Sequence, residues 1–421
     1  MLNLELTDQL LNIAAKYGTP CYVYDKQQFL KNYDLYKTSF ESYSNLCKYL
    51  ICYAVKANSN LTVLNQLAKV GSGFDIVSVG ELNRVLKAGG DSNKIVFSGV
   101  GKQDFEIKAA LDADILSFNI ESEAELILTN QIAKQLNKIA PISIRVNPNI
   151  DAKSHPYIST GLKEHKFGIN IDNAEYIYQL ASELSHIKIT GIDCHIGSQL
   201  TDIRPLEQAC LAINKLILQL LANNIIIKHI NMGGGLGINY SSQYLELPSH
   251  KLWVDTIVQN INPEQKLHDL TIVIEPGRSI IGNAGLLLTT VIYNKVDNIN
   301  DHSFVIVDAA MNDLMRPALY GAEHRIINLK DSESNISNIS NISIVGPVCE
   351  SSDVFLKNIN LEACQGDILA ILDTGAYGFT MSSNYNSRPR AAEVLIDNDQ
   401  DFLIRKRETI EDLYNHEIIF Y

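Results

Sequence analysis

The chain has 421 residues, of which 46% are hydrophobic and 20% are charged, and its formal net charge at pH 7 is −13. This length accommodates two domains, each with its own core. An acidic chain without a run of lysines or arginines lacks the basic surface that nucleic acids require, so nucleic-acid binding is not expected.

The N-terminal segment, residues 1–18, has the apolar periodicity of an amphipathic helix, with Glu5 and Asp8 inside the pattern. It lacks the basic start and the apolar block of a signal peptide. The apolar window Leu211–Ile227 is interrupted by Lys215, so no membrane-spanning helix is expected. The seven cysteines are odd in number and form no Cys-x-x-Cys pair, which favours a reducing cytoplasm over a disulfide framework.

From residue 21 onward, β-type apolar runs alternate with helical periodicity. A short run at Cys21–Tyr24 is followed by eight others, at Leu50–Val55, Gly73–Val77, Lys94–Ser98, Asp114–Asn119, Ile142–Asn147, Ile187–His195, Ile226–Asn231 and Thr271–Glu275. Amphipathic stretches between them include Leu61–Val70, Gly80–Ala88, Glu121–Lys138, Asn173–Leu184 and Arg204–Ala222. Strands that alternate with helices indicate βαβ units, and eight units predict a TIM-like (β/α)₈ barrel.

After Glu275 the pattern changes to β-type runs with little helix between them, at Leu286–Tyr293, Phe304–Val307, Ile342–Val345, Asp367–Leu372 and Ala392–Ile396. This change predicts a mostly antiparallel β-sandwich or barrel domain, which the strand at Cys21–Tyr24 is expected to join. The predicted boundaries are 26–281 for the barrel, and 1–25 together with 282–421 for the β domain. A tandem repeat of Asn-Ile-Ser beginning at Asn335 is expected to be a surface loop that leads into a strand.

Polar residues stand where the predicted barrel strands end, and in a barrel these positions form the rim of the active site. They are Lys56, Asp75, Ser78, Ser98, Arg145, Asn147, His195, Asn231 and Glu275. A desolvated lysine can form a Schiff base with a carbonyl compound. The alternative for Lys56 is an ordinary strand-end lysine whose ammonium reaches water.

A glycine-rich loop follows the seventh predicted strand, with the sequence Gly233-Gly234-Gly235-Leu236-Gly237. Barrels often bind phosphate in the loops after strands seven and eight, through backbone N–H groups that approach the anion closely. Ser198 in the preceding loop, and Gly277 with Arg278 after the last strand, add further donors. A phosphorylated ligand is therefore predicted.

An imine-forming lysine, a phosphate site and a carboxylate in one barrel mouth predict pyridoxal phosphate as the cofactor. Glu275 is expected to face the pyridine nitrogen and keep it protonated, and His195 is expected to lie against the ring. The alternative for His195 is a hydrogen-bonded core histidine. No metal site is expected, because the ten histidines show no H-E-x-x-H or comparable spacing.

Further motifs extend over nearly the whole chain. They are Tyr53-Ala-Val-Lys-Ala-Asn58, Phe74-Asp-Ile-Val-Ser-Val-Gly-Glu81, Lys166-Phe-Gly168, His195-Ile-Gly-Ser-Gln199, Glu275-Pro-Gly-Arg278, Met311-Asn-Asp-Leu-Met-Arg-Pro-Ala-Leu-Tyr320, Gly346-Pro-Val-Cys-Glu-Ser351, Gly375-Ala-Tyr377 and Arg388-Pro-Arg-Ala-Ala-Glu-Val394. With these motifs the chain resembles the fold-type III pyridoxal-phosphate decarboxylases, and within them the enzymes that act on diaminopimelate.

The resemblance implies a role for each matching residue. Lys56 would carry the cofactor covalently, and the remaining cofactor-binding residues would be Asp75, His195, Ser198, Gly234, Gly235, Glu275, Gly277, Arg278 and Tyr377. Substrate would be bound by Arg278, Arg316, Tyr320, Glu350 and Tyr377, with the arginines and Tyr320 on its carboxylates. Cys349 and Glu350 would enter from the other subunit of a head-to-tail homodimer, Cys349 as proton donor and Glu350 as a contact for the substrate ammonium.

The activity that the resemblance implies is the decarboxylation of meso-2,6-diaminopimelate to L-lysine, the last step of lysine biosynthesis by the diaminopimelate route. The segment His155–Gly161 resembles the loop that covers the pocket in such enzymes.

Three alternatives remain open. A decarboxylase of the ornithine or arginine type would need an acid where this chain has Arg278, Arg316 and Tyr320. An amino-acid racemase of the same barrel type would need a second base facing Lys56, a task that Cys349 with its neighbouring glutamate fits poorly. A non-catalytic pyridoxal-phosphate-binding homologue would be expected to lack Lys56 or Cys349, and both are present.

Overall fold

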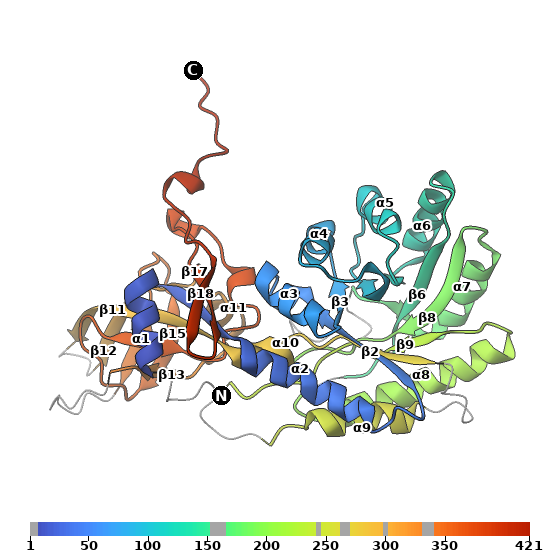
Figure 1. The fold of residues 1–421 in the computed structure, drawn as a ribbon, viewed down its shortest axis with the longest axis horizontal. Helices are drawn as coiled ribbons and strands as arrows, with labels where there is room; N and C mark the ends of the chain where they lie inside the picture. Colours follow the sequence, from blue (N-terminus) through green and yellow to red (C-terminus); the bar gives the residue numbers. More distant parts are fainter. Residues whose placement is uncertain (1–6, 152–165, 241–245, 262–269, 298–301, 331–340) are drawn as a thin grey trace. The chain divides into compact units, whose positions relative to one another are not determined.

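The computed structural model describes residues 7–151, 166–240, 246–261, 270–297, 302–330 and 341–421 (Figure 1). The chain divides into two compact units. The first, called here the β unit, comprises Met1–Phe29, Asn239–Leu245 and Ile281–Tyr421, and the second, the barrel unit, comprises Leu30–Ile238 and Glu246–Ile280.

Parallel strands that close on themselves form the centre of the barrel unit. Within the described residues their order is β5-β4-β3-β2-β10-β9-β8-β6, and a pairing between β5 and β6 closes the circle. The strands are β2 (Lys48–Ala54), β3 (Gly73–Ile76), β4 (Ile95–Phe97), β5 (Ser117–Ile120), β6 (Ala140–Asn147), β8 (Ile187–Asp193), β9 (His229–Asn231) and β10 (Thr271–Ile274). Each overlaps a predicted run, and the predicted (β/α)₈ barrel is confirmed.

Helices connect the strands of the barrel (Figure 1). They are α2 (Lys26–Glu41), α3 (Leu61–Lys69), α4 (Val79–Lys87), α5 (Asp104–Asp112), α6 (Glu123–Gln135), α7 (Ile171–Glu183), α8 (Arg204–Ala222) and α9 (His250–Asn260). Side-chain caps start several of them: Asn60 accepts from the Thr62 N–H, and Ser78 accepts from the Glu81 N–H. These caps fix where the loops at the barrel mouth end. A short strand, β7 (Ile169–Asn170), pairs in parallel with the last two residues of β6.

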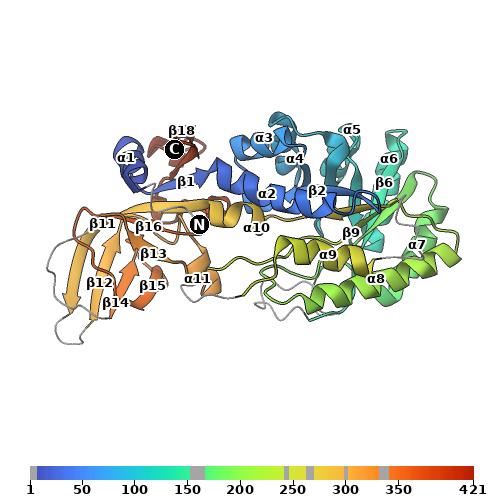
Figure 2. The same ribbon diagram turned by 60° about the horizontal axis from the view of Figure 1, so that its bottom comes forward.

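The β unit contains a sheet in the order β15-β14-β12-β11-β1-β17-β18, while β16 pairs with β11 and β13 (Figure 2). The strands are β1 (Cys21–Asp25), β11 (Gly285–Asp297), β12 (His302–Val307), β13 (Ile326–Asn328), β14 (Ile342–Val345), β15 (Val354–Ile359), β16 (Ile368–Ile371), β17 (Ala392–Asp397) and β18 (Gln400–Arg405). Most pairings are antiparallel; β1 with β17 and β12 with β14 are parallel. The predicted second domain, built mostly of antiparallel β-strands, is confirmed.

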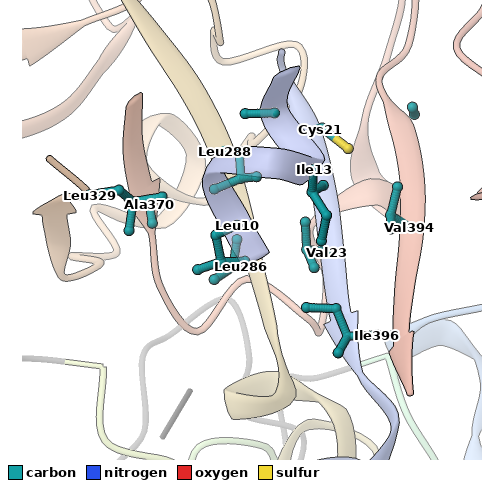
Figure 3. Close-up of a cluster of buried hydrophobic side chains, with 12 residues drawn as sticks. Leu10, Ile13, Cys21, Val23, Leu286, Leu288, Leu329, Ala370, Val394 and Ile396 are labelled. Carbon is teal, nitrogen blue, oxygen red and sulfur yellow. The ribbon is translucent and has the colours of Figure 1, made fainter. Parts of the chain in front are cut away.

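The N-terminal strand β1 joins the β unit, as predicted, and lies between two strands from the C-terminal third of the chain. Cys21 is opposite Leu288 of β11 on one side and Ala392 of β17 on the other. Helix α1 (Thr7–Tyr17) packs on these strands, and Figure 3 shows Leu10 and Ile13 in a buried cluster with side chains of β1, β11 and β17. The predicted amphipathic helix is confirmed for these residues.

Two segments singled out in the sequence lie wholly or partly outside the described residues. One is His155–Gly161, the predicted pocket-covering loop. The other is the Asn-Ile-Ser repeat, of which the last copy, beginning at Asn341, leads into β14. In the described part of the chain, no helix is long and apolar enough to cross a membrane. None of the seven cysteines, all of which are described, forms a disulfide.

Candidate active site

Lys56 lies in a single 3₁₀ turn, Val55–Ala57, directly after β2. Its Nζ is 2.6 Å from Oδ2 of Asp75, which is on the paired strand β3. The Asp75 side chain is fully buried, whereas the Lys56 side chain is 36% exposed. The other oxygen of Asp75, Oδ1, is buried without a hydrogen-bond partner among the described residues. Lys56 is therefore held by a buried carboxylate, unlike a solvated strand-end lysine.

Glu275 follows β10, and its Oε1 accepts hydrogen bonds from the side-chain amides of Asn231 and, at 3.4 Å, Asn119. Burial raises the pKa of Glu275 well above its ordinary value, and the charges of Asp75 and Asp193 raise that pKa further. Taking a carboxylate out of water disfavours its charged form. A cationic ring nitrogen beside Glu275 would restore the charged form, which is the role predicted for this residue.

His195 follows β8 and is partly buried. Burial lowers the pKa of His195 well below its ordinary value, and the positive charges of Arg145 and Lys56 lower it further. The imidazole is therefore neutral at physiological pH. Its Nδ1 accepts the N–H of Gly234 at 3.2 Å, which fixes the ring against the glycine-rich loop. A neutral ring of fixed orientation is suited to stacking on a planar ligand.

The glycine-rich loop is packed too closely for side chains. A Cβ on Gly234 would lie 2.2 Å from the carbonyl oxygen of Glu275, and one on Gly235 would lie 2.7 Å from that of Gly197. A Cβ on Gly277 would lie 2.9 Å from Cβ of Ala57, the residue after Lys56. Within the described residues, the N–H groups of Gly235 and Gly277 donate to no protein acceptor. Such amides form a cradle for an anion.

Ser198 and Arg278 connect the loops after β8 and β10. The Ser198 hydroxyl oxygen accepts from Nε and Nη2 of Arg278 at 3.3 and 3.1 Å. The Arg278 guanidinium is buried, so it places a positive charge at the phosphate side of the predicted site. This contact brings together two residues that are 80 positions apart in the sequence.

The same unit contains a buried group of ion pairs around Arg145, and this pairing was not evident from the sequence. Arg145 of β6 contacts Glu121 at 2.9 Å and Asp193 at 3.8 Å. Burial raises the pKa of Asp193 to about 7. Asn119, which contacts Glu275, was also passed over. Asn119 is the last residue but one of β5, and Asp193 is the last residue of β8. The rule that polar residues at strand ends form the site, which found Lys56, could therefore have found both.

The barrel unit thus brings together the predicted residues Lys56, Asp75, His195, Ser198, Gly234, Gly235, Glu275, Gly277 and Arg278. An amine, a glycine cradle with an adjacent guanidinium, a flat neutral imidazole and a carboxylate that favours a cation fit pyridoxal phosphate. The remaining predicted residues, Arg316, Tyr320, Cys349, Glu350 and Tyr377, belong to the β unit.

In the β unit, Arg316 and Tyr320 are the first and last residues of the short helix α11. Arg316 is buried, and its Nη1 is 2.8 Å from Nε2 of His324. The backbone of Tyr377 has a positive φ of 57°. Among the described residues, no group of histidine, cysteine and acidic side chains is arranged to hold a metal ion.

Cys349 and Glu350 lie before β15. Cys349 is exposed, and its backbone N–H donates to Oδ1 of Asn386 at 3.0 Å. The carboxylate of Glu350 accepts a hydrogen bond from the hydroxyl of Tyr385. The thiol and the carboxylate are therefore presented on the surface of the unit.

The chain is similar in sequence and in structure to known proteins. Residues 27–282 match the family described as pyridoxal-dependent decarboxylase, pyridoxal binding domain. Diaminopimelate decarboxylases of Vibrio cholerae and Pseudomonas aeruginosa are each 48% identical over 96% of this chain and 94% of their own length. A crystal structure of diaminopimelate decarboxylase from Helicobacter pylori complexed with L-lysine is similar with a TM-score of 0.90 and 44% identity, over 97% of this chain and 99% of that one.

Proposed function

This chain belongs to the pyridoxal-dependent decarboxylase family, and we propose on that basis that it converts meso-2,6-diaminopimelate to L-lysine and CO₂. The observation that carries the proposal is Lys56, paired with the buried Asp75 in the mouth of a barrel that also holds a glycine cradle and Glu275. The named relatives align over 96% of the chain, so the alignment includes residues of both units.

Each predicted site residue of the barrel unit would have a task in this reaction. Lys56 would hold pyridoxal phosphate, which supplies an electron sink for the bond that breaks at Cα of the substrate. Glu275 would keep the ring nitrogen protonated. The amides of Gly235 and Gly277 and the hydroxyl of Ser198 would hold the phosphate, with Tyr377 as a further donor. His195 would lie on the ring and exclude water from that face.

The arginines favour one of the substrates that the sequence left open. Diaminopimelate keeps a second carboxylate at the end of the chain that does not react, and Arg278, Arg316 and Tyr320 are donors suited to a carboxylate. Ornithine and arginine place a cation there, which two guanidinium groups would repel. The names of the relatives support the same choice.

We propose a homodimer in which Cys349 and Glu350 of one subunit complete the site of the other. Both side chains are exposed in the isolated chain, which leaves them accessible to a second copy. Cys349 would add the proton that replaces the lost CO₂, and Glu350 would contact the substrate ammonium. We place the reaction in the cytoplasm, in agreement with seven cysteines that form no disulfide.

A substrate comparison tests the activity. Purified holoenzyme is given meso-diaminopimelate, ornithine and arginine separately, and the CO₂ released is measured. We expect CO₂ from diaminopimelate and at most a trace from the other two. CO₂ from ornithine or arginine alone would overturn the substrate assignment, and epimerised diaminopimelate without CO₂ would indicate a racemase.

A second experiment tests the role of Lys56. Borohydride reduction of the holoenzyme, followed by peptide mapping, is expected to find the cofactor on the peptide that contains Lys56. The matched control is Lys102, a buried lysine whose Nζ is 2.7 Å from Glu125 and which lies in the same unit. Label on Lys102, or on any lysine other than Lys56, would refute the assignment.

A further inference from the structure

His324 contacts the guanidinium of Arg316 through a nitrogen of its ring. His324 is 1% exposed, and its Nε2 is 2.8 Å from Nη1 of Arg316. On the other side of the ring, Nδ1 is 2.8 Å from the carbonyl oxygen of Leu372. A guanidinium can only donate and a carbonyl can only accept, so Nε2 is the acceptor and Nδ1 carries the proton. The two partners therefore define a neutral imidazole with a single tautomer.

Tyr240 completes this arrangement within the β unit. The Cζ of Arg316 lies 4.2 Å from the centroid of the Tyr240 ring, so the guanidinium rests on the aromatic face. The same ring meets His324 edge-to-face, with centroids 5.1 Å apart and planes at 76°. The guanidinium is thus fixed in position by the aromatic face and in rotation by His324.

We propose that His324 is a positioning residue for the substrate carboxylate. In its neutral form it fixes the Arg316 fork so that the remaining N–H donors are oriented before the substrate arrives, and protonation of His324 abolishes this hold. The inference rests on the proposed function, because it assigns a partner to an arginine that would bind the carboxylate. A fork ordered in advance loses less conformational freedom on binding.

The charged surroundings of His324 determine what its protonation does. Arg325, the next residue, is paired with Asp373 at 2.6 Å, and Glu323 precedes His324. His324 also contacts the guanidinium of Arg316 and the ring of Tyr240. Since the carboxylate of Asp373 is engaged by Arg325, the group that faces Nε2 is the Arg316 cation. An imidazolium would present a second donor, and a second positive charge, to that cation.

His324 also lines a hollow of about 310 Å³, whose lining includes Tyr240, Glu323, Arg325, Ile326 and Leu356. A space of this size with polar groups on its wall accommodates water.

Two inhibitors that differ in one carboxylate test the proposal. L-Lysine keeps the carboxylate that Arg316 would bind, whereas cadaverine lacks it. In the His324→Phe variant the ring still packs on Tyr240 but the acceptor is lost. We expect the inhibition constant of L-lysine to rise about tenfold, the order of one lost charge-assisted hydrogen bond, and that of cadaverine to change less than about twofold. Equal changes for both inhibitors, or no change for either, would overturn the proposal.

The His324→Gln variant is the matched control. The amide oxygen of glutamine can replace Nε2 as acceptor. We expect its KM for diaminopimelate and its inhibition constant for L-lysine to stay within about twofold of the wild-type values. A glutamine variant that is as impaired as the phenylalanine variant would contradict the role of His324. If the phenylalanine variant does not fold, the tautomer of His324 in the wild-type enzyme decides.

A measurement on the resting holoenzyme separates this inference from the proposed function. ¹⁵N NMR of histidine-labelled protein, with His324→Gln to assign the signal, is expected to show His324 protonated at Nδ1 at neutral pH. Protonation at Nε2 would refute the hold on Arg316 even if diaminopimelate is decarboxylated. Absence of CO₂ release together with the expected tautomer would refute the proposed function and leave the contact intact.

Discussion

The Nζ atom of Lys56 lies 2.6 Å from the buried carboxylate of Asp75, whereas the amine of an ordinary strand-end lysine would meet water. A charge-assisted hydrogen bond to a buried carboxylate holds the amine in one direction. Burial shifts the pKa values of two further residues in opposite directions: it raises the pKa of Glu275 and lowers the pKa of His195. Burial thus favours the neutral form of both groups, and a bound cationic ring would change this only for Glu275.

Cys349 provides a test of proton donation at the residue scale. We expect Cys349→Ala to lower turnover about 10²–10⁴-fold, the usual contribution of a positioned proton donor, with the absorption band of the bound cofactor unchanged. The backbone N–H of Cys349, which donates to Asn386, is kept in the variant, so the loop should retain its conformation. The measurements are steady-state CO₂ release and the visible spectrum.

Cys364→Ala is the matched control, since Cys364 is half-buried and has no assigned role. It should behave as the wild-type enzyme does. Unchanged turnover in Cys349→Ala would exclude the thiol as proton donor, whereas loss of the cofactor band would indicate a structural cysteine.

At the scale of elements, the hydrophobic pattern located most of the strands but not their partners. The run at Cys21–Tyr24 is evident in the sequence, while its place between β11 and β17 depends on residues more than 260 positions away. The strands β7, β13, β15 and β18 were not predicted. β7 and β13 have only two and three residues, and β15 and β18 lie at the two edges of their sheet. Short or edge strands give a weak local signal because pairing, and not their own composition, defines them.

Close packing between neighbouring barrel strands leads to a prediction for Gly191. Gly191 of β8 is opposite His229 of β9, and a Cβ on it would lie 2.3 Å from Nε2 of that histidine. His229 is buried and its Nε2 is 2.7 Å from the hydroxyl of Ser143, so the ring has little room to move. We expect Gly191→Ala to lower the free energy of unfolding by about 1–3 kcal/mol, measured by urea denaturation.

Gly101→Ala is the control for this substitution, because a Cβ on Gly101 would meet nothing within 4 Å. It should change the free energy of unfolding by less than about 0.5 kcal/mol. Equal effects of the two substitutions would show that the His229 ring yields to the added methyl group.

At the scale of the whole molecule, buried histidines make stability depend on pH. Burial lowers the pKa of His229 and of His250 to about 4. Between about pH 6.5 and pH 4 the unfolded chain therefore binds protons that the folded chain does not. The free energy of unfolding should fall as the pH falls through this window, by about 1.4 kcal/mol per pH unit for each histidine.

The variant His250→Phe tests this dependence. The slope of the unfolding free energy against pH should decrease by about 1.4 kcal/mol per pH unit, the contribution of one histidine. Unfolding is measured by the fluorescence of the single tryptophan, Trp253, on the same helix. His416→Phe, at an exposed position, should leave the slope unchanged. A slope in His250→Phe equal to that of the wild-type protein would mean that His250 is protonated in the folded state.

Assembly leads to a prediction that needs two chains. If each site takes Lys56 from one subunit and Cys349 from the other, mixing the inactive variants Lys56→Ala and Cys349→Ala should recover about a quarter of the wild-type activity, since half of the exchanged dimers have one intact site. Mixing Lys56→Ala with Glu275→Gln should recover none, because both residues belong to one barrel unit. No recovery in the first mixture would refute the shared site.

The sequence by itself determined the barrel and the β unit, and it predicted the lysine, glycines and glutamate of the proposed cofactor site. Each of these depends on a local pattern: apolar runs of strand length, a glycine cluster, or a polar residue where a strand ends. Only the tertiary structure decided which side chains meet, such as Asn119 and Asn231 at Glu275, or His324 at Arg316. The physical reason is that contact and burial arise when distant strands close into a sheet, and burial sets the charge that each group carries.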